Sequence, residues 1–103
     1  SAPVQASVFS ITDRQQAYSQ TVTEQLKAAG FRAEADLRNE KVGFKIREAE
    51  KAKIPYMLVV GDREMEAETV SVRGRSGANL GAMSVPKVIE LMRADVVQPT
   101  LSR

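Results

Sequence analysis

The sequence contains no cysteine and no histidine among its 103 residues. Without cysteine it has no disulfide, thiolate metal site or thiol nucleophile, and without histidine it has no imidazole for acid–base chemistry. These two absences exclude most common hydrolase mechanisms. The lack of cysteine also fits a reducing compartment, and we expect the protein to be cytoplasmic.

Long apolar runs and aromatic residues are scarce as well. No stretch approaches the roughly 20 apolar residues that span a bilayer, and the N-terminus lacks a basic segment followed by an apolar one. We therefore expect no membrane partner and no export signal. The chain has only two tyrosines and three phenylalanines, so Phe44 is interpreted as a core or helix-face residue rather than a platform for base stacking.

The charge balance is mildly basic. Fifteen Lys and Arg residues stand against 13 Asp and Glu residues, which gives a net charge of +2 and a pI near 9.2. This balance permits a nucleic-acid partner without demanding one. The basic excess is concentrated between Arg38 and Lys53. We expect a solvent-facing basic flank there, formed by Lys41, Lys45, Arg47, Lys51 and Lys53.

Apolar periodicity predicts a βαβ unit at the start of the chain. Residues 4–11 are apolar enough for a buried strand. Asp13 and Gln16 have the spacing of a capping box, which predicts a helix that ends at Gly30. Residues 31–35 then form a second short strand, parallel to the first and connected to it in the right-handed sense.

The middle of the chain predicts a second helix and a central strand. Asn39 is placed to cap a helix over residues 40–52. The apolar run at 56–60 is typical of a parallel strand that is covered on both faces. Residues 61–68 are rich in charge, and we expect them to form a loop at the end of that strand.

The last third of the chain predicts a hairpin and a final helix. Residues 69–74 alternate apolar and polar side chains and can pair with residues 80–83. Ser84 then caps the last helix, with a proline tolerated in its first turn. These elements predict an α/β fold of three layers, a mixed five-stranded sheet with helices on both faces.

The length of the chain allows one core and one domain, which we expect to cover residues 1–103. Residues 1–3 are interpreted as the remnant of a linker or of cloning. Residues 98–103 are interpreted as a tail.

Ligands of open α/β sheets bind beyond the carboxyl ends of the parallel strands. Three loops are predicted to converge there, formed by residues 12–13, 36–41 and 61–66. They bring together Asn39, Lys41 and Glu64, and Arg73 on the neighbouring strand is expected to reach the same surface. This group holds one amide, one carboxylate and two cations, which is not a metal-binding set.

Such a group suits the reading of base edges. A carboxylate can accept both N–H groups of the pairing edge of guanine, Arg can donate to guanine O6 and N7, and Asn can pair with a pyrimidine. Each residue also has a simpler interpretation. Asn39 can be a helix cap only, Glu64 a solvated acid only, and Arg73 an exposed strand residue only.

Three stretches carry longer motifs. They read Asp-Leu-Arg-Asn-Glu-Lys-Val-Gly-Phe-Lys-Ile-Arg-Glu-Ala at 36–49, Ile-Pro-Tyr-Met-Leu-Val-Val-Gly-Asp-Arg-Glu at 54–64 and Val-Ser-Val-Arg-Gly-Arg at 70–75. Together they resemble the C-terminal anticodon-binding domain of the threonyl-tRNA synthetases, from Pro3 to about Arg93. A looser frame is shared with the prolyl, glycyl and histidyl enzymes of class IIa: Asp36, Arg38, Gly43, Lys45, Pro55 and Gly61-Asp62.

The resemblance implies a partner and a set of site residues. In the family, the positions that match Asn39, Lys41, Glu64 and Arg73 belong to the surface that reads the threonine anticodon, whose second and third letters are G and U. The partner would be the anticodon loop of tRNA(Thr). As candidate contacts to the RNA backbone we add Arg38, Lys45 and Arg75.

The resemblance also implies that the chain alone is not an enzyme, because it lacks the class II motifs that bind ATP and the amino acid. The parent ligase would use ATP, Zn and Mg and form a homodimer, whereas the isolated domain would be a monomer without a cofactor. An alternative stays open. The chain can be a free-standing or accessory domain of the same fold that acts in protein–protein or general RNA interaction.

Overall fold

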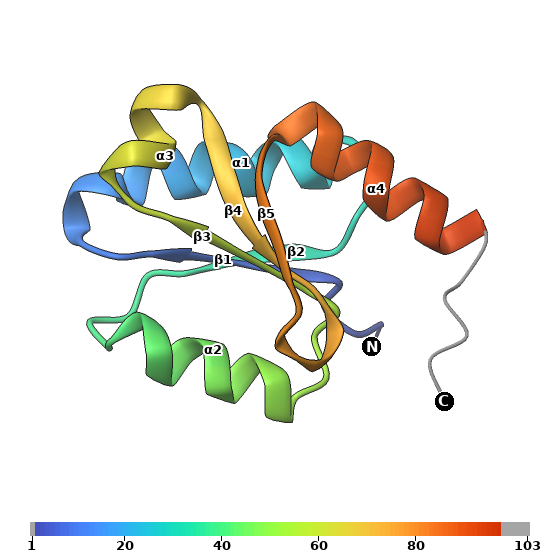
Figure 1. Ribbon diagram of the computed structural model, residues 1–103, viewed down its shortest axis with the longest axis horizontal. Helices are drawn as coiled ribbons and strands as arrows, with labels where there is room; N and C mark the ends of the chain where they lie inside the picture. The colour runs from blue at the N-terminus through green and yellow to red at the C-terminus, as the bar shows by residue number, and fades with distance from the viewer. Residues whose placement is uncertain (1, 98–103) are drawn as a thin grey trace.

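The computed structural model describes residues 2–97, and the predicted tail at 98–103 lies outside them. Figure 1 shows a five-stranded sheet with α1 and α4 on one face and α2 on the other. The elements are β1 (Ala6–Ser10), η1 (Asp13–Gln15), α1 (Gln16–Ala28), β2 (Ala33–Asp36), α2 (Val42–Lys51), β3 (Tyr56–Val60), α3 (Asp62–Ala67), β4 (Thr69–Arg73), η2 (Arg75–Gly77), β5 (Asn79–Ser84) and α4 (Val85–Val97).

The strand order is β2-β1-β3-β4-β5. Strands β2, β1 and β3 are parallel, whereas β4 and β5 are antiparallel to their neighbours. The predicted mixed five-stranded sheet in three layers is therefore confirmed. The crossover from β1 to β2 runs through α1 and the crossover from β2 to β3 runs through α2, so the two helices cover opposite faces of the sheet.

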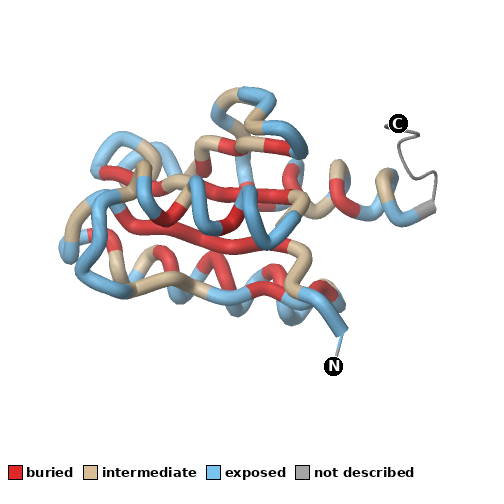
Figure 2. The backbone as a smooth tube through the Cα atoms, turned by 90° about the horizontal axis from the view of Figure 1, so that it is seen from below, coloured by how far each residue is buried: buried red, intermediate tan, exposed pale blue. Residues whose placement is uncertain are grey.

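Two apolar clusters hold the layers together. Figure 2 shows the buried strands in the middle of the molecule. The larger cluster joins the sheet to α1 and α4, with Leu58 of β3 completely buried. The smaller cluster joins Phe9 and Met57 to Ala49 of α2. Leu58 and Met57 face opposite sides because successive side chains of a strand alternate. This explains the continuous apolar run that predicted a central strand.

The first helical turn is capped one residue earlier than predicted. Thr12 is the N-cap of η1, and its Oγ1 accepts a hydrogen bond from the backbone N–H of Arg14 at 3.3 Å. Gln15 completes the box, since its Oε1 accepts from the backbone N–H of Thr12 at 2.8 Å. Gln15 takes this role because its side chain is buried at the end of β1, whereas Asp13 and Gln16 only bond to each other at the surface.

The predicted cap of the second helix is wrong. The helix begins at Val42 with the backbone of Lys41 as its N-cap, and no side chain caps it. The turn before it is organised instead by Asp36, whose Oδ1 accepts from the backbone N–H of Arg38 at 3.2 Å. This side-chain bond stabilises the turn locally and leaves Asn39 two residues short of the N-cap position.

The charged segment after β3 is also not a loop. Residues Asp62–Ala67 form the short helix α3, which ends at Glu68 in the left-handed conformation with a φ of 56°. Its first turn is closed by Glu64, as described below. The cap predicted for the last helix is confirmed, because Ser84 Oγ accepts from the backbone N–H of Lys87 at 3.3 Å.

Candidate nucleic-acid interface

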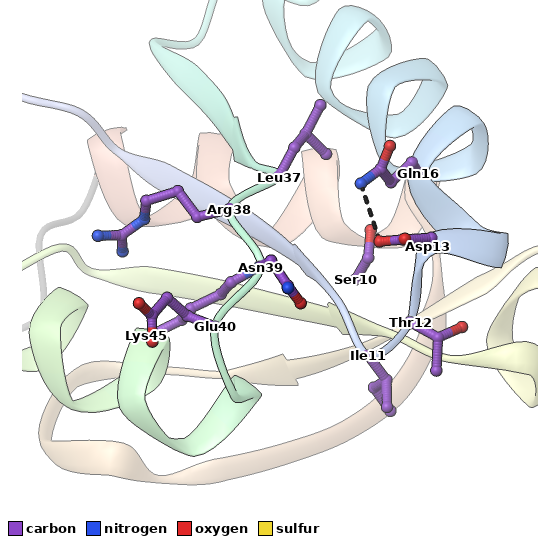
Figure 3. A pocket seen from close by; sticks show the side chains of 10 residues that line it. All are labelled: Ser10, Ile11, Thr12, Asp13, Gln16, Leu37, Arg38, Asn39, Glu40 and Lys45. Atoms are coloured by element: carbon purple, nitrogen blue, oxygen red, sulfur yellow. Dashed lines mark hydrogen bonds between the residues drawn. The ribbon is translucent and has the colours of Figure 1, made fainter.

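A cavity of about 290 Å³ lies at the carboxyl ends of β1 and β2. The connection after β1 leads to α1 and the connection after β2 leads to α2, on opposite faces, and such a divergence opens a crevice at the edge of the sheet. Figure 3 shows the side chains around it. The cavity is lined by Ser10, Ile11, Thr12, Asp13, Gln16, Leu37, Arg38, Asn39, Glu40 and Lys45.

Asn39 and Lys41 are the two predicted site residues beside this cavity. Asn39 lines it, and Lys41 lies next to it at the start of α2. Both are exposed. Within residues 2–97 neither side chain makes a hydrogen bond or an ion pair. Both polar groups are therefore available to a ligand without the loss of an internal contact.

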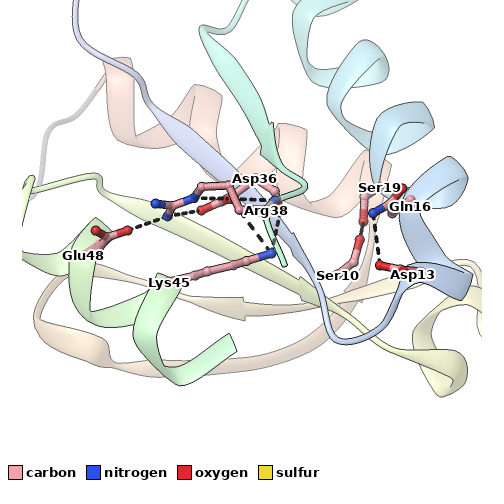
Figure 4. Close-up of polar contacts among 8 residues, drawn as sticks. All are labelled: Ser10, Asp13, Gln16, Ser19, Asp36, Arg38, Lys45 and Glu48. Atoms are coloured by element: carbon pink, nitrogen blue, oxygen red, sulfur yellow. Dashed lines mark hydrogen bonds and ion pairs between the residues drawn. The ribbon is translucent and has the colours of Figure 1, made fainter. Parts of the chain in front are cut away.

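Lys45 does not belong to the basic flank, and that prediction is wrong. Its side chain is 2% exposed, and its Nζ donates to the backbone carbonyl of Asp36 at 2.8 Å (Figure 4). The helical spacing already contained this signal, because Lys45 lies three residues after Val42 and four before Ala49, on the inward stripe of α2. A phosphate contact from Lys45 would require its ammonium to leave the Asp36 carbonyl.

Arg38 is exposed but already paired. It donates to both carboxylate oxygens of Asp36, at 2.9 and 2.8 Å, and also to Glu48 on α2. Its guanidinium carbon lies 5.9 Å from the centre of the Phe44 ring. The hydrogen bond from Arg38 is the main cause that lowers the pKa of Asp36. Arg38 thus links the end of β2 to α2 through its contacts with Asp36 and Glu48.

Glu64 has a structural contact as well as an open side. Its Oε1 accepts from the backbone N–H of Gly61 at 2.8 Å, which closes the N-terminus of α3. The second oxygen, Oε2, makes no hydrogen bond within the described part of the chain. A Cβ at Gly61 would lie 3.3 Å from Glu64 Oε1 and 2.8 Å from Ile11. The carboxylate therefore lies at the carboxyl end of β3, close to the exposed Ile11.

Helix α3 is itself tied to the loop after β1. Arg14 forms an ion pair with Asp62 at 2.8 Å, and the Gln15 amide donates to the same carboxylate. The hydrogen bond from Arg14 is the main cause that lowers the pKa of Asp62. These contacts hold the first turn of α3, and with it Glu64, against the end of β1.

Arg73 lies at the other end of the sheet. It pairs with Met57 in the register of β3 and β4, so its side chain shares the α2 face. Thr69, at the carboxyl edge, is four residues or about 13 Å away along the strand. The four predicted residues thus form no compact cluster. They form a polar band that extends from the carboxyl edge of the sheet, with Asn39, Lys41 and Glu64, to Arg73 on the α2 face.

Arg75 and Lys53 lie beyond Arg73. Arg75 Nη1 contacts Asp95 at 2.9 Å, and Asp95 also accepts from the Tyr56 hydroxyl at 2.9 Å. A cavity of about 390 Å³ separates the C-terminus of α2 from η2 and is lined by Glu50, Lys53, Ile54, Met57, Arg75 and Ser76. This second hollow was not predicted from the sequence, because it forms between residues 50–57 and residues 75–76, which lie far apart in the chain.

Asp13 and Leu37, which line the first cavity, belong to the loops at 12–13 and 36–41 that were predicted to converge at this edge of the sheet. Gln16 also lines the cavity, but it was interpreted only as a helix-capping residue. No group of three potential metal ligands occurs in residues 2–97. In the same range no helix is long and apolar enough to cross a bilayer.

Comparison with known sequences identifies relatives. Residues 5–95 match the family model of the anticodon binding domain. The threonine–tRNA ligase of Halorhodospira halophila is 56% identical over 95 residues, which cover 92% of this chain and 15% of the ligase. That of Magnetococcus marinus is 54% identical over 101 residues, which cover 98% of this chain and 16% of the ligase. The chain therefore spans less than a fifth of the length of these relatives.

Solved structures agree with this result. The RNA binding domain of threonyl-tRNA synthetase from Cryptosporidium parvum Iowa II superposes with a TM-score of 0.82 at 27% identity, covering 90% of this chain and 24% of that one. Histidyl-tRNA synthetase from Nostoc sp. PCC 7120 gives a TM-score of 0.84 at 19% identity, over 92% and 23%, which shows the shared fold. The resemblance drawn from the sequence motifs is confirmed, and the chain belongs to the family of anticodon-binding domains.

Proposed function

We propose that the chain binds the anticodon stem-loop of tRNA(Thr), as the recognition domain of a cytoplasmic threonine–tRNA ligase. The observation that carries the proposal is the polar band formed by Asn39, Lys41, Glu64 and Arg73. The side chains of Asn39, Lys41 and Arg73 make no hydrogen bond or ion pair within residues 2–97, and Glu64 Oε2 makes no hydrogen bond there. Membership of the anticodon-binding family supports the assignment of this band to RNA.

The band offers different contacts to different parts of an RNA loop. The Asn39 amide and the Glu64 carboxylate present acceptors, and in Asn39 also donors, that match the pairing edges of unstacked bases. Arg73 can donate to a guanine or to a phosphate. Lys41 carries a charge at an exposed helix start and suits a phosphate. The five aromatic rings of the whole chain are too few for base stacking to dominate, so hydrogen bonds carry the recognition.

In this proposal the chain binds RNA, and the rest of the parent protein carries out catalysis. The ligase activity, with its ATP, Zn and Mg, would reside in the part of the relatives that this chain does not span. We expect the isolated chain to be a monomer, and the parent ligase to be a homodimer. Pure chain should show no threonine-dependent exchange of pyrophosphate into ATP.

Binding of synthetic stem-loops tests the proposal directly. One loop carries the threonine anticodon, and two others change its second letter from G to A or its third from U to C. We expect the threonine loop to bind most tightly, with the logarithm of affinity falling by about 0.7 per phosphate contact for each unit of log salt. Equal affinity for all three loops would contradict base reading. A salt-independent affinity would favour the accessory protein-interaction domain instead.

A further inference from the structure

A lysine is buried where an apolar residue would be expected. The Lys45 side chain is 2% exposed and lies on the face of α2 that packs on the sheet. Removal of an ammonium group from water is costly, and apolar side chains often stabilise a buried position as well as an ion pair does. Stability alone therefore gives a poor reason for a lysine at this place.

The contacts of Lys45 converge on the residue where β2 ends. Its Nζ donates to the Asp36 carbonyl at 2.8 Å and lies 3.9 Å from Asp36 Oδ1. The Asp36 carboxylate is held on its other side by Arg38. Figure 4 shows that Lys45 reaches Asp36 from α2, whereas Arg38 approaches from the turn itself. Both the backbone and the side chain of Asp36 are thus fixed.

Asp36 is the first anchor of the segment that carries two of the proposed RNA-binding residues. The segment covers residues 37–41, and its second anchor is the start of α2. Its own backbone contributes the bond from the Glu40 N–H to the Arg38 carbonyl, at 2.9 Å. Lys45 also lines the cavity beside Asn39. The position of Asn39 and Lys41 therefore depends on the contact between α2 and the end of β2.

We propose that Lys45 is a positioning residue for RNA recognition: from inside α2 it holds the 37–41 segment in the conformation that presents Asn39 and Lys41 to the RNA, without touching the RNA itself. The inference rests on the proposed function. Groups that are fixed before binding lose less conformational entropy when the ligand arrives, so the positioning increases affinity. A lysine suits this task because its long stem crosses the apolar layer and its head donates to a carbonyl.

The test compares Lys45→Met with the wild-type chain. Methionine keeps the long apolar stem and removes the ammonium group. At a temperature where circular dichroism shows both proteins folded, we expect the threonine stem-loop to bind about tenfold more weakly to Lys45→Met at every salt concentration. The log–log salt slope should stay unchanged, because no phosphate contact is lost. Without RNA, hydrogen exchange of the amides of residues 38–41 should accelerate.

Two control variants make the slope informative. Lys51→Met removes an exposed lysine from the end of the same helix and should leave hydrogen exchange at 38–41 unchanged. Lys41→Met removes a proposed phosphate contact and should reduce the salt slope by about 0.7. If Lys45→Met is unfolded at the assay temperature, Lys45→Gln, which retains a donor without the charge, is measured in the same way. Its loss of affinity for the threonine stem-loop should be smaller than the loss that a mismatched anticodon letter causes in the wild-type chain.

Each outcome decides between the alternatives. A slope reduced by about 0.7 in the Lys45 variant would mean that Lys45 contacts a phosphate directly. Unchanged affinity and exchange, with a lower melting temperature only, would leave it a purely structural residue. Either result overturns the inference. If instead the wild-type chain fails to discriminate among the stem-loops, the proposed function fails, whereas the exchange measurement still reports whether Lys45 holds the segment.

Discussion

Replacement of Glu64 by glutamine separates base reading from general attraction to RNA. Glu64 Oε1 accepts from the Gly61 N–H at 2.8 Å, and a glutamine can keep this bond because the capping box accepts either residue. With its oxygen committed to Gly61, the new amide must present its NH₂ group where Oε2 was. A donor would then face the two N–H donors of a guanine pairing edge.

Base reading and a role as a surface acid predict opposite changes in RNA affinity for Glu64→Gln. Loss of base reading should weaken binding of a loop with G at the second letter by about 1–3 kcal/mol, or roughly 5- to 150-fold in Kd. If Glu64 is only a surface acid, removal of its charge should tighten binding to the polyanion. The fold should tolerate the change, since the lost interaction with the helix dipole is worth about 0.3–1 kcal/mol.

Fluorescence anisotropy with matched stem-loops that carry G or A at the second letter measures this effect. We expect Glu64→Gln to reduce the preference for G as well as the affinity. Glu66→Gln, which removes an exposed acid from the same helix, serves as the charge-matched control and should bind slightly more tightly with an unchanged preference. If Glu64→Gln behaves like Glu66→Gln, the assignment of base reading to Glu64 is refuted.

Three further predictions follow from the fold and the interface. Leu58→Ala, at a completely buried position of the central strand, should lower the free energy of unfolding in urea by about 2–5 kcal/mol, and a loss under 1 kcal/mol would contradict the packing described. Burial and the bond to Asp95 raise the pKa of Tyr56 to about 12. Because the unfolded state loses this proton near pH 10, the free energy of unfolding should fall between about pH 10 and 12. Tyr56→Phe should make this fall with pH smaller, as measured by alkaline denaturation. Lys41→Ala should weaken all stem-loops about equally, and a selective loss for one base would assign Lys41 to base reading instead.

The elements with strong local patterns were predictable from sequence. The apolar run of β3, the alternation in β4 and the cap at Ser84 were all found where the structure has them. Each depends on periodicity or on side chain to backbone bonds over a few residues, which a sequence displays directly. The family motifs at 36–49 and 54–64 were equally visible.

The short helix α3 and the start of α2 were not predictable in the same way. The capping contact of Glu64 to Gly61 is local, but six residues, four of them charged, are too few to show helical periodicity. Before α2, Asn39 matched the residue type that often caps a helix N-terminus. Asp36 organised the turn instead, because its carboxylate also receives Arg38 and its carbonyl receives Lys45.

By itself, the sequence determined the fold class, the family and the residue types available for RNA recognition, because these follow from pattern and composition. Only the tertiary structure decided which partners the cations find and which groups share one surface. The helical spacing of Lys45 already indicated its inward position, but its bond to the Asp36 carbonyl depends on how α2 packs against the end of β2. Arg73 stands far from Glu64 because β4 runs antiparallel to β3, which no local pattern encodes.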